Sequence, residues 1–185
     1  MLPMKKMSAY LAGCRILIID DVGSFQQLTR TILKSFGAAS VISARSLTEG
    51  MHKMNYLGAN KTANLNIDLI LMDINLPDGD GIDACQYLSS YAGDYNIPLV
   101  VVSGTSDTVT INKALEAGAS DYLHKPLARN LLGTRLGMLM AMRAQQPVKY
   151  QNELAWAAVE GDISGSGNMA ETAETGTDLF MTRQY

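Results

Sequence analysis

Four short strand-like segments, three of them apolar runs, are each followed at once by a polar side chain, and this pattern constrains the fold of this chain more than any other feature. The segments are residues 16–19, 67–72, 99–102 and 121–124, and the residues that follow them are Asp20 with Asp21, Asp73, Ser103 and Lys125. Continuous apolar runs of this length are typical of strands buried on both faces of a parallel sheet. The carboxyl ends of such strands lie side by side, and ligands bind in the crevice outside them.

Helical patterns separate these segments along the chain. Strands are predicted at 15–20, 41–44, 67–73, 98–103 and 121–124, and helices at 24–36, 47–57, 81–91, 107–117 and 127–143. In the first helix, apolar residues recur at helical spacing (Phe25, Leu28, Ile32, Leu33 and Phe36). Parallel strands need crossover connections, which right-handed helical crossovers supply on both faces of the sheet. The sequence therefore predicts an α/β fold with a doubly wound, five-stranded parallel sheet.

Both ends of the chain, and one internal loop, differ in character from this pattern. Residues 1–13 form a predicted N-terminal arm with one helical turn, and 58–66 form a long polar loop. Residues 147–185 form a predicted C-terminal extension, with a short helix at 150–160 and then an acidic, mostly disordered tail. Six acidic and two basic residues follow Pro147. We expect one main domain at residues 14–146.

Composition excludes several classes of protein. The net charge of −3 gives no sign of nucleic-acid binding. Two cysteines, Cys14 and Cys85, are too few for a disulfide scaffold and suit a reduced, cytoplasmic protein. The sequence shows neither a signal peptide nor a stretch long enough to span a membrane, so we expect no membrane insertion.

The polar residues at the predicted strand ends suit phosphoryl transfer. Carboxylates that converge repel one another unless a cation lies among them, and Asp20, Asp21 and Asp73 would suit octahedral Mg²⁺. A carboxylate can act as a nucleophile and form an acyl phosphate. Phosphoryl transfer then asks mainly for neutralisation of the equatorial oxygens, which Mg²⁺, Lys125 and the Ser103 hydroxyl would supply.

Five segments of the chain, in order and in spacing, resemble the receiver domain of two-component response regulators. They are residues 17–21, 71–81, 101–104, 117–122 and 125–126, and the resemblance covers about 14–145. It implies a flavodoxin-like sheet with strand order 2-1-3-4-5. It also implies a cis peptide bond between Lys125 and Pro126.

The resemblance implies a role for each site residue. Asp73 would be the phosphoacceptor, and Asp20 and Asp21 would hold Mg²⁺ together with the backbone carbonyl of Asn75. Lys125 would pair with the phosphate. Ser103 would be the switch hydroxyl, and Tyr122 would turn into the space that Ser103 vacates on phosphorylation. The face formed by the fourth helix, the fifth strand and the fifth helix would change in consequence.

The implied function is signalling. The phosphate would come from the phosphohistidine of a histidine kinase or phosphotransfer protein, and the altered face would dock on a downstream protein. We expect self-phosphotransfer and self-dephosphorylation but no other enzymatic activity. No helix-turn-helix can be assembled after Pro147, so no direct DNA binding is expected. The sequence leaves a homodimer open.

Other interpretations remain at this stage. A haloacid-dehalogenase-type phosphohydrolase also uses an aspartate nucleophile, but it needs a second acid two residues later, where this chain has Asn75. A receiver fold can also serve as an interaction module that is never phosphorylated. Taken alone, Asp73 could be a turn cap and Tyr122 a core residue. Asp78 and Asp80 are interpreted as solvated turn residues.

Overall fold

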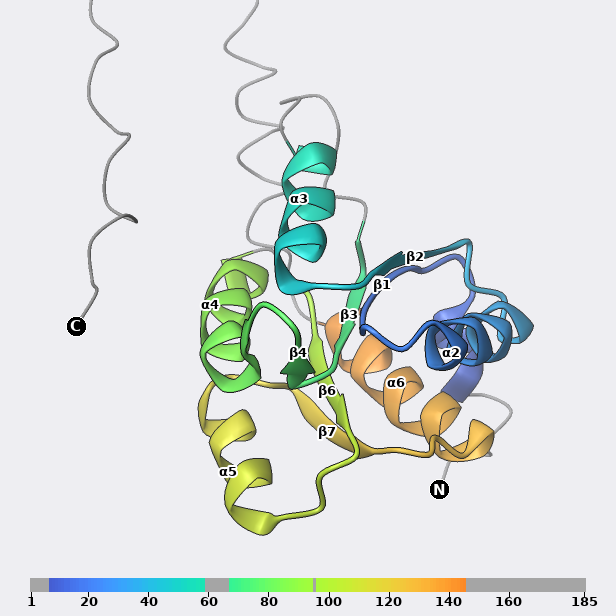
Figure 1. Cartoon of the computed structure of the whole chain (residues 1–185). Coiled ribbons are helices and arrows are strands. Elements are labelled where there is room, and N and C mark those ends of the chain that lie inside the picture. Colours follow the sequence, from blue (N-terminus) through green and yellow to red (C-terminus); the bar gives the residue numbers. More distant parts are fainter. Residues whose placement is uncertain (1–6, 59–66, 95, 146–185) are drawn as a thin grey trace, which may run out of the picture. The chain divides into compact units, whose positions relative to one another are not determined.

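The computed structural model describes residues 7–58, 67–94 and 96–145. Within these residues one parallel sheet has the order β2-β1-β3-β6-β7 (Figure 1). Its strands are β1 (Arg15–Ile19), β2 (Ser40–Ala44), β3 (Leu69–Met72), β6 (Leu99–Ser103) and β7 (Asp121–His124). Counted along the chain, these strands have the order 2-1-3-4-5. The predicted doubly wound, flavodoxin-like sheet is therefore confirmed.

Helices connect the strands and cover both faces of the sheet. They are α2 (Gly23–Ser35), α3 (Leu47–Gly58), α4 (Gly81–Asp94), α5 (Thr108–Glu116) and α6 (Arg129–Arg143). Helices α2 and α6 lie on one face, and α3, α4 and α5 lie on the other (Figure 1). A short antiparallel hairpin, β4 (Asn75–Leu76) with β5 (Gly79–Asp80), lies between β3 and α4 and was not predicted.

The alternation of side chains along the strands divides the core into two clusters. Leu17, Ile19 and Met72 pack toward α3, α4 and α5, where Leu88 and Ala114 meet them. The intervening strand residues pack on the opposite face against α2 and α6 (Ile16, Ile18, Leu69, Leu71, Val100 and Val102). Because successive side chains of a strand point to opposite faces, each strand supplies both clusters.

The N-terminal arm is part of the second cluster. Residues Ser8–Leu11 form a 3₁₀ helix, η1, which confirms the predicted helical turn, and Leu11 is fully buried. Two buried glycines of α6 face neighbouring segments: Gly137 faces Met7, the residue before η1, and Gly133 faces Phe36. A Cβ atom at Gly137 would overlap the carbonyl oxygen of Met7, and one at Gly133 would lie 2.7 Å from the Phe36 ring. The glycines therefore allow Met7 and Phe36 to approach the helix backbone closely.

Helix α2 departs from the predicted apolar pattern at one residue, Leu28, while the other four residues of the pattern pack on the second core cluster. Leu28 is 56% exposed, whereas Gln26, Thr29 and Leu33 form the buried stripe. The helix begins after Val22, and no side chain caps its N-terminus. Polar Gln26 takes an inward position because it has backbone partners at the strand ends, described below.

Two predictions lie outside the described residues. They are the character of the loop at 58–66, apart from Gly58 itself, and the whole extension at 147–185 with its helix at 150–160. The boundaries of the main domain at 14–146 and of the extension therefore stay predictions. No helix in the described part of the chain is both long and apolar enough to span a membrane.

Candidate functional site

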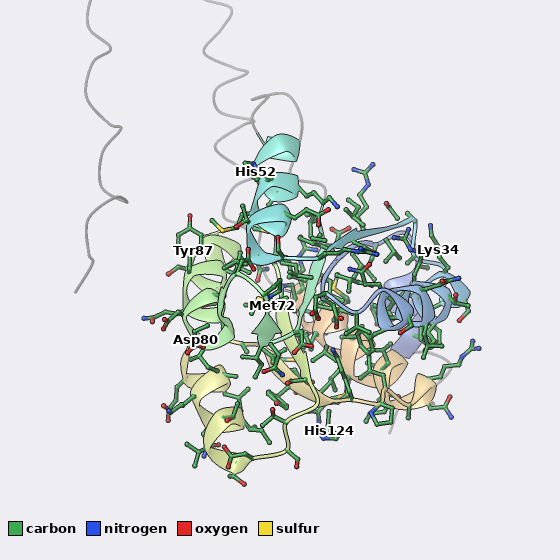
Figure 2. All side chains as sticks on the ribbon, in the orientation of Figure 1. Lys34, His52, Met72, Asp80, Tyr87 and His124 are labelled. Atoms are coloured by element: carbon green, nitrogen blue, oxygen red, sulfur yellow. The ribbon has the colours of Figure 1, made fainter. Side chains whose placement is uncertain are left out.

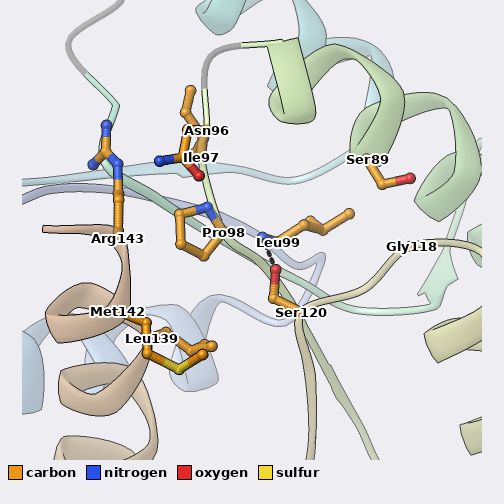
Figure 3. Close-up of a pocket in the computed structure, with 10 residues that line it drawn as sticks. All are labelled: Ser89, Asn96, Ile97, Pro98, Leu99, Gly118, Ser120, Leu139, Met142 and Arg143. Atoms are coloured by element: carbon orange, nitrogen blue, oxygen red, sulfur yellow. Dashed lines mark hydrogen bonds between the residues drawn. The ribbon is translucent and has the colours of Figure 1, made fainter. Parts of the chain in front are cut away.

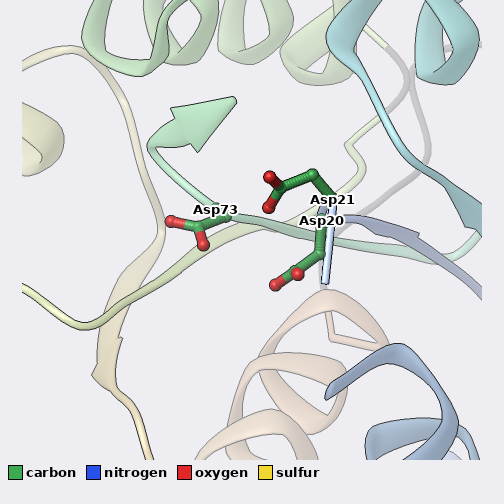
Figure 4. Close-up of side chains that lie close together, drawn as sticks. All are labelled: Asp20, Asp21 and Asp73. Atoms are coloured by element: carbon green, nitrogen blue, oxygen red, sulfur yellow. The ribbon is translucent and has the colours of Figure 1, made fainter. Parts of the chain in front are cut away.

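The strand register brings the polar strand ends together at one edge of the sheet. Ile19 pairs with Met72, and Met72 with Val101, so the residues that follow β1 and β3 emerge side by side. The Asp73 amide donates a hydrogen bond to the Ile19 carbonyl at 2.9 Å. Figure 4 shows the carboxylates of Asp20, Asp21 and Asp73 gathered at this edge.

These three carboxylates form an acidic cluster that fits a hard divalent cation. One carboxylate oxygen from each residue lies within 4.8 Å of the others. Asp20 and Asp73 are 1% and 5% exposed, whereas Asp21 is exposed. Oxygen ligands that leave part of the coordination sphere to water are the arrangement that Mg²⁺ prefers. The predicted acidic residues are therefore brought together, in a geometry that Mg²⁺ fits.

Lys125 neutralises the buried part of this cluster. Its ammonium nitrogen lies 2.6 Å from Asp20 Oδ2 and 2.5 Å from Asp73 Oδ2. The other oxygen of each carboxylate accepts a backbone N–H, Asp20 Oδ1 from Val22 at 2.9 Å and Asp73 Oδ1 from Asn75 at 3.0 Å. Lys125 follows β7, and its peptide bond to Pro126 is cis, as predicted.

Burial and charge act in opposite directions on these groups. Burial raises the pKa of Asp20, and the hydrogen bond from Lys125 offsets only part of that effect. Burial also works to lower the pKa of Lys125, but its hydrogen bonds to Asp20 and Asp73 outweigh it, so the pKa is raised. The difference arises because Asp20 faces one cation whereas Lys125 faces two anions. The ammonium is therefore held in its charged form.

The switch residues predicted from the resemblance lie in one hydrogen-bonded series beside the acids. The fully buried Ser103 hydroxyl accepts from the Asn75 side-chain amide at 3.3 Å and from the Thr105 amide at 3.4 Å. The Tyr122 hydroxyl donates to the Thr105 carbonyl at 2.7 Å, and Tyr122 is 9% exposed. Tyr122 therefore already lies inward, and Thr105 links it to Ser103.

Two further residues reach the site from the first turns of α2, and sequence reasoning missed both roles. Lys125 Nζ lies over the Phe25 ring, 4.2 Å from its centroid. The Gln26 side-chain amide donates to the carbonyl of Asp20 at 2.5 Å and of Ala44 at 2.8 Å. The signal that could have found Gln26 is its spacing: it lies three and seven residues before the buried Thr29 and Leu33.

Asp78 is an exposed turn residue, as predicted, but it also has a capping role that was not predicted. Its carboxylate accepts the backbone N–H groups of Leu47 at 2.9 Å and Thr48 at 2.8 Å, and so caps the start of α3. Asp80 likewise accepts the Ile82 N–H at 2.8 Å at the start of α4. Helix N-termini leave N–H groups without intrahelical partners, which explains why both acids bind there. The hairpin that follows Asp73 is thus attached to two helices.

Other polar groups of the described residues lie apart from this site. A cavity of about 310 Å³ at the opposite edge of the sheet is lined by Asn96, Ser120, Met142 and Arg143, among others (Figure 3). None of the described residues that line it is acidic. His52 and His124 lie on different elements at the periphery, whereas Met72 is buried in the interior (Figure 2). The acidic cluster is the metal-binding candidate found in the described part of the chain.

Comparison with known families agrees with the geometry. The family model of the response regulator receiver domain matches residues 16–136. The chain belongs to this family. Receiver domains are signalling domains of two-component systems, and this chain carries the acidic cluster consistent with their Mg²⁺ site.

Relatives and solved structures of receiver proteins show how far the likeness extends. The "DNA-binding response regulator MtrA" of Mycobacterium tuberculosis is 29% identical over 80% of this chain, which spans 59% of that protein. The "KDP operon transcriptional regulatory protein KdpE" of Escherichia coli is 34% identical over 65% of this chain, which spans 48% of that protein. This chain thus spans about half to three-fifths of the length of these relatives.

Among solved structures, a CheY-like receiver domain protein from Methanospirillum hungatei has a TM-score of 0.63 and 25% identity, and the match covers 72% of this chain and 98% of that one. A two-component response regulator from Clostridium difficile has a TM-score of 0.60 and 27% identity, and its match covers 72% and 99%. The matched region is therefore nearly the whole of each solved receiver chain.

Proposed function

We propose that this receiver is a phosphoacceptor: with Mg²⁺ bound, Asp73 takes a phosphoryl group from a phosphohistidine of a histidine kinase or phosphotransfer protein. An Asp73 carboxylate oxygen forms the new bond to phosphorus as the bond from phosphorus to the histidine nitrogen breaks. The observation that carries the proposal is the position of Asp73. Its carboxylate lies within the acidic cluster, at the edge of the sheet, in contact with Lys125.

Each neighbouring residue has a part in this transfer. Asp20, Asp21, Asp73 and the backbone carbonyl of Asn75 would hold Mg²⁺, which when bound neutralises charge on the phosphoryl oxygens. Lys125 contacts Asp73 Oδ2 and would follow the negative charge outward onto the phosphoryl group. Ser103 would donate its hydroxyl to another phosphoryl oxygen.

The same movement would carry the signal to the surface. Ser103, Asn75 and Thr105 share hydrogen bonds, and Thr105 holds the Tyr122 hydroxyl. Displacement of Ser103 toward the phosphate therefore changes the loop to which Tyr122 is bound. Because Tyr122 is already inward, we propose that phosphorylation tightens its contact with this loop, and so alters the face of α5, β7 and α6.

Labelling tests the proposal directly. Incubation with radiolabelled acetyl phosphate and Mg²⁺ is expected to label the full chain, and chelation of Mg²⁺ to abolish the label. Asp73→Asn is expected to remain folded and unlabelled, because an amide cannot act as the nucleophile. Asp78→Asn, which changes a nearby acid outside the cluster, serves as the matched control and is expected to be labelled. Label that survives in Asp73→Asn would contradict the assignment.

The output of the pathway is also a proposal. MtrA and KdpE are named as DNA-binding and transcriptional regulators, but this chain spans only part of each. The residues after Pro147 are acidic in balance, which does not suit contact with phosphate backbones. We propose a protein target, without direct DNA binding or membrane insertion, and a cytoplasmic location.

A further inference from the structure

We propose that Phe25 is a positioning residue, whose ring holds the Lys125 ammonium within reach of the phosphoryl group while Asp20 and Asp73 are taken up by metal binding and phosphorylation. The inference rests on the proposed function and assigns a part in it to a residue outside the predicted site. Its basis is the placement of the ammonium over the ring, 4.2 Å from the centroid.

The two carboxylate contacts of the Lys125 ammonium leave room for a third partner, the Phe25 ring. An ammonium carries three N–H donors, and Asp20 Oδ2 and Asp73 Oδ2 accept two of them. The face of an aromatic ring is negative and attracts a cation, more strongly where water is excluded. The Lys125 side chain is 18% exposed, so its ammonium is largely withdrawn from water. Phe25 is thus a third partner of the ammonium, beside the two carboxylates.

The three partners of the Lys125 ammonium change in different ways during the reaction. Both carboxylates belong to the acidic cluster, so a metal ion would compete with Lys125 for the same oxygens. On phosphorylation Asp73 would become an acyl phosphate, so its carboxylate charge would be lost and the negative charge would lie on the phosphoryl oxygens. The Phe25 ring neither binds a hard cation nor changes charge. It is therefore the partner of Lys125 that persists through metal binding and transfer.

The ring is placed by the same helix turns that support the acids. Phe25 and Gln26 are consecutive residues near the start of α2; Phe25 contacts Lys125, and Gln26 binds the carbonyl of Asp20. Phe25 is half-buried and packs on the second core cluster, which limits its side-chain rotation. The position of the ring is thus tied to that of Asp20, which also contacts the ammonium.

A matched pair of substitutions separates positioning from general packing. Phe25→Leu removes the ring beside Lys125. Phe36→Leu removes another half-buried ring, whose centroid lies 5.1 Å from Arg129 Cζ rather than beside Lys125. With acetyl phosphate and Mg²⁺, we expect Phe25→Leu to be phosphorylated about fivefold more slowly, as suits loss of one partly desolvated cation–π contact. Phe36→Leu should keep the wild-type rate, and Phe25→Tyr should restore most of it.

Two further readouts do not depend on folding stability. Fluorinated phenylalanines placed at residue 25 weaken the negative ring face stepwise at almost constant size, so the phosphorylation rate should fall stepwise with them. By NMR, the protons next to the Lys125 ammonium should be shifted upfield by the ring, with and without Mg²⁺, and the shift should vanish in Phe25→Leu.

The outcomes are distinguishable. A flat fluorination series, or Phe25→Leu and Phe36→Leu with equal rates, would overturn the role of Phe25 while Asp73-dependent labelling stands. An upfield shift that disappears when Mg²⁺ is added would show that the ring does not retain Lys125, and would overturn it too. Absence of label in the wild type, or label in Asp73→Asn, would instead refute the proposed function itself.

Discussion

Gln26 shows how a single buried polar side chain supports the site without belonging to it. Its amide joins the backbone carbonyls at the ends of β1 and β2, and the residue is 9% exposed. A buried polar group without a partner is costly, so the residue stabilises the fold through the acceptors that it satisfies. It also fixes the backbone at Asp20, on which the metal-binding geometry depends.

Gln26→Leu is expected to lower the free energy of unfolding by about 1–3 kcal/mol, because two buried carbonyls lose the Gln26 amide and only that of Ala44 keeps a second donor, the Asp20 N–H. Urea denaturation measures the change. Gln27→Leu, at the adjacent exposed position of the same helix, is the matched control and should change stability by less than about 0.5 kcal/mol. Equal effects of the two substitutions would contradict the role given to Gln26.

At the residue scale, the sequence predicted the polar residues of the site better than the residues that hold them in position. Asp20, Asp73, Ser103 and Lys125 could be predicted because each follows a strand-like segment at the strand's carboxyl end. The role of Phe25 could not be predicted, because helical periodicity assigns a residue to a helix face but does not show that the Lys125 ammonium lies over its ring. Its partner, Lys125, lies a hundred residues further along the chain.

Among the elements, the short hairpin β4–β5 is connected by hydrogen bonds to two helices. Each of its strands has two residues, yet Asp78 caps α3 and Asp80 caps α4. Such short strands carry no recognisable periodicity, which is why the sequence did not predict them. The partners of Asp78 precede it by about thirty residues, beyond the range of any local capping pattern.

Asp78→Ala is expected to destabilise the fold by about 1 kcal/mol through loss of the α3 cap. Burial works to raise the pKa of Asp78, but the hydrogen bonds from Thr48 and Leu47 outweigh it and hold the pKa below the ordinary 3.8. The unfolded chain therefore binds the proton more tightly. The stabilisation is complete above pH 3.8 and is lost as the pH falls through the lowered pKa.

Urea denaturation at a series of pH values tests this dependence. The difference between wild type and Asp78→Ala should be constant near neutrality and should close on acidification. Glu116→Ala, at an exposed position, serves as control and should show no such closure. A difference that grew as the pH fell would contradict the capping role.

The contact of η1 with α6 gives a second prediction at this scale. Alanine favours helices over glycine by about 1 kcal/mol, so Gly137→Ala would stabilise an uncovered helix. Here the added methyl group would overlap the Met7 carbonyl. We expect a net loss of about 1–2 kcal/mol of unfolding free energy, since overpacking costs about 1–3 kcal/mol. Met138→Ala, on the exposed face of α6, is the control; a more stable Gly137→Ala would show that η1 is not seated as described.

Over the whole molecule, the sheet and its two helical layers follow from the alternation of strands and helices in the sequence. The predicted third strand, 67–73, is longer than β3 (Leu69–Met72), although the amides of Asp68 and Asp73 on either side of β3 still donate to the carbonyls of Arg15 and Ile19. The loop at 59–66 and the extension after residue 146 lie outside the described residues.

Metal binding should stabilise the molecule as a whole. A ligand that binds only the folded state adds RT ln(1 + [L]/Kd), so Mg²⁺ at ten times its Kd should add about 1.4 kcal/mol to the unfolding free energy. Thermal denaturation with and without Mg²⁺ measures this. Asp20→Asn should lose most of the increment, whereas Glu116→Ala should retain it. An equal increment in Asp20→Asn would show that Mg²⁺ acts elsewhere.

The division of the core between the two faces of the sheet affects which amino-acid substitutions the protein can accept independently of one another. Leu33 belongs to one cluster and Leu88 to the other, with the strand backbones between them. Substitutions in separate neighbourhoods usually combine additively. Substitutions on one face of the sheet should therefore have little effect on the other face. The α5 side could be substituted to bind a new partner, while the α2 and α6 side, which holds Phe25 and Gln26, continues to support the same chemistry.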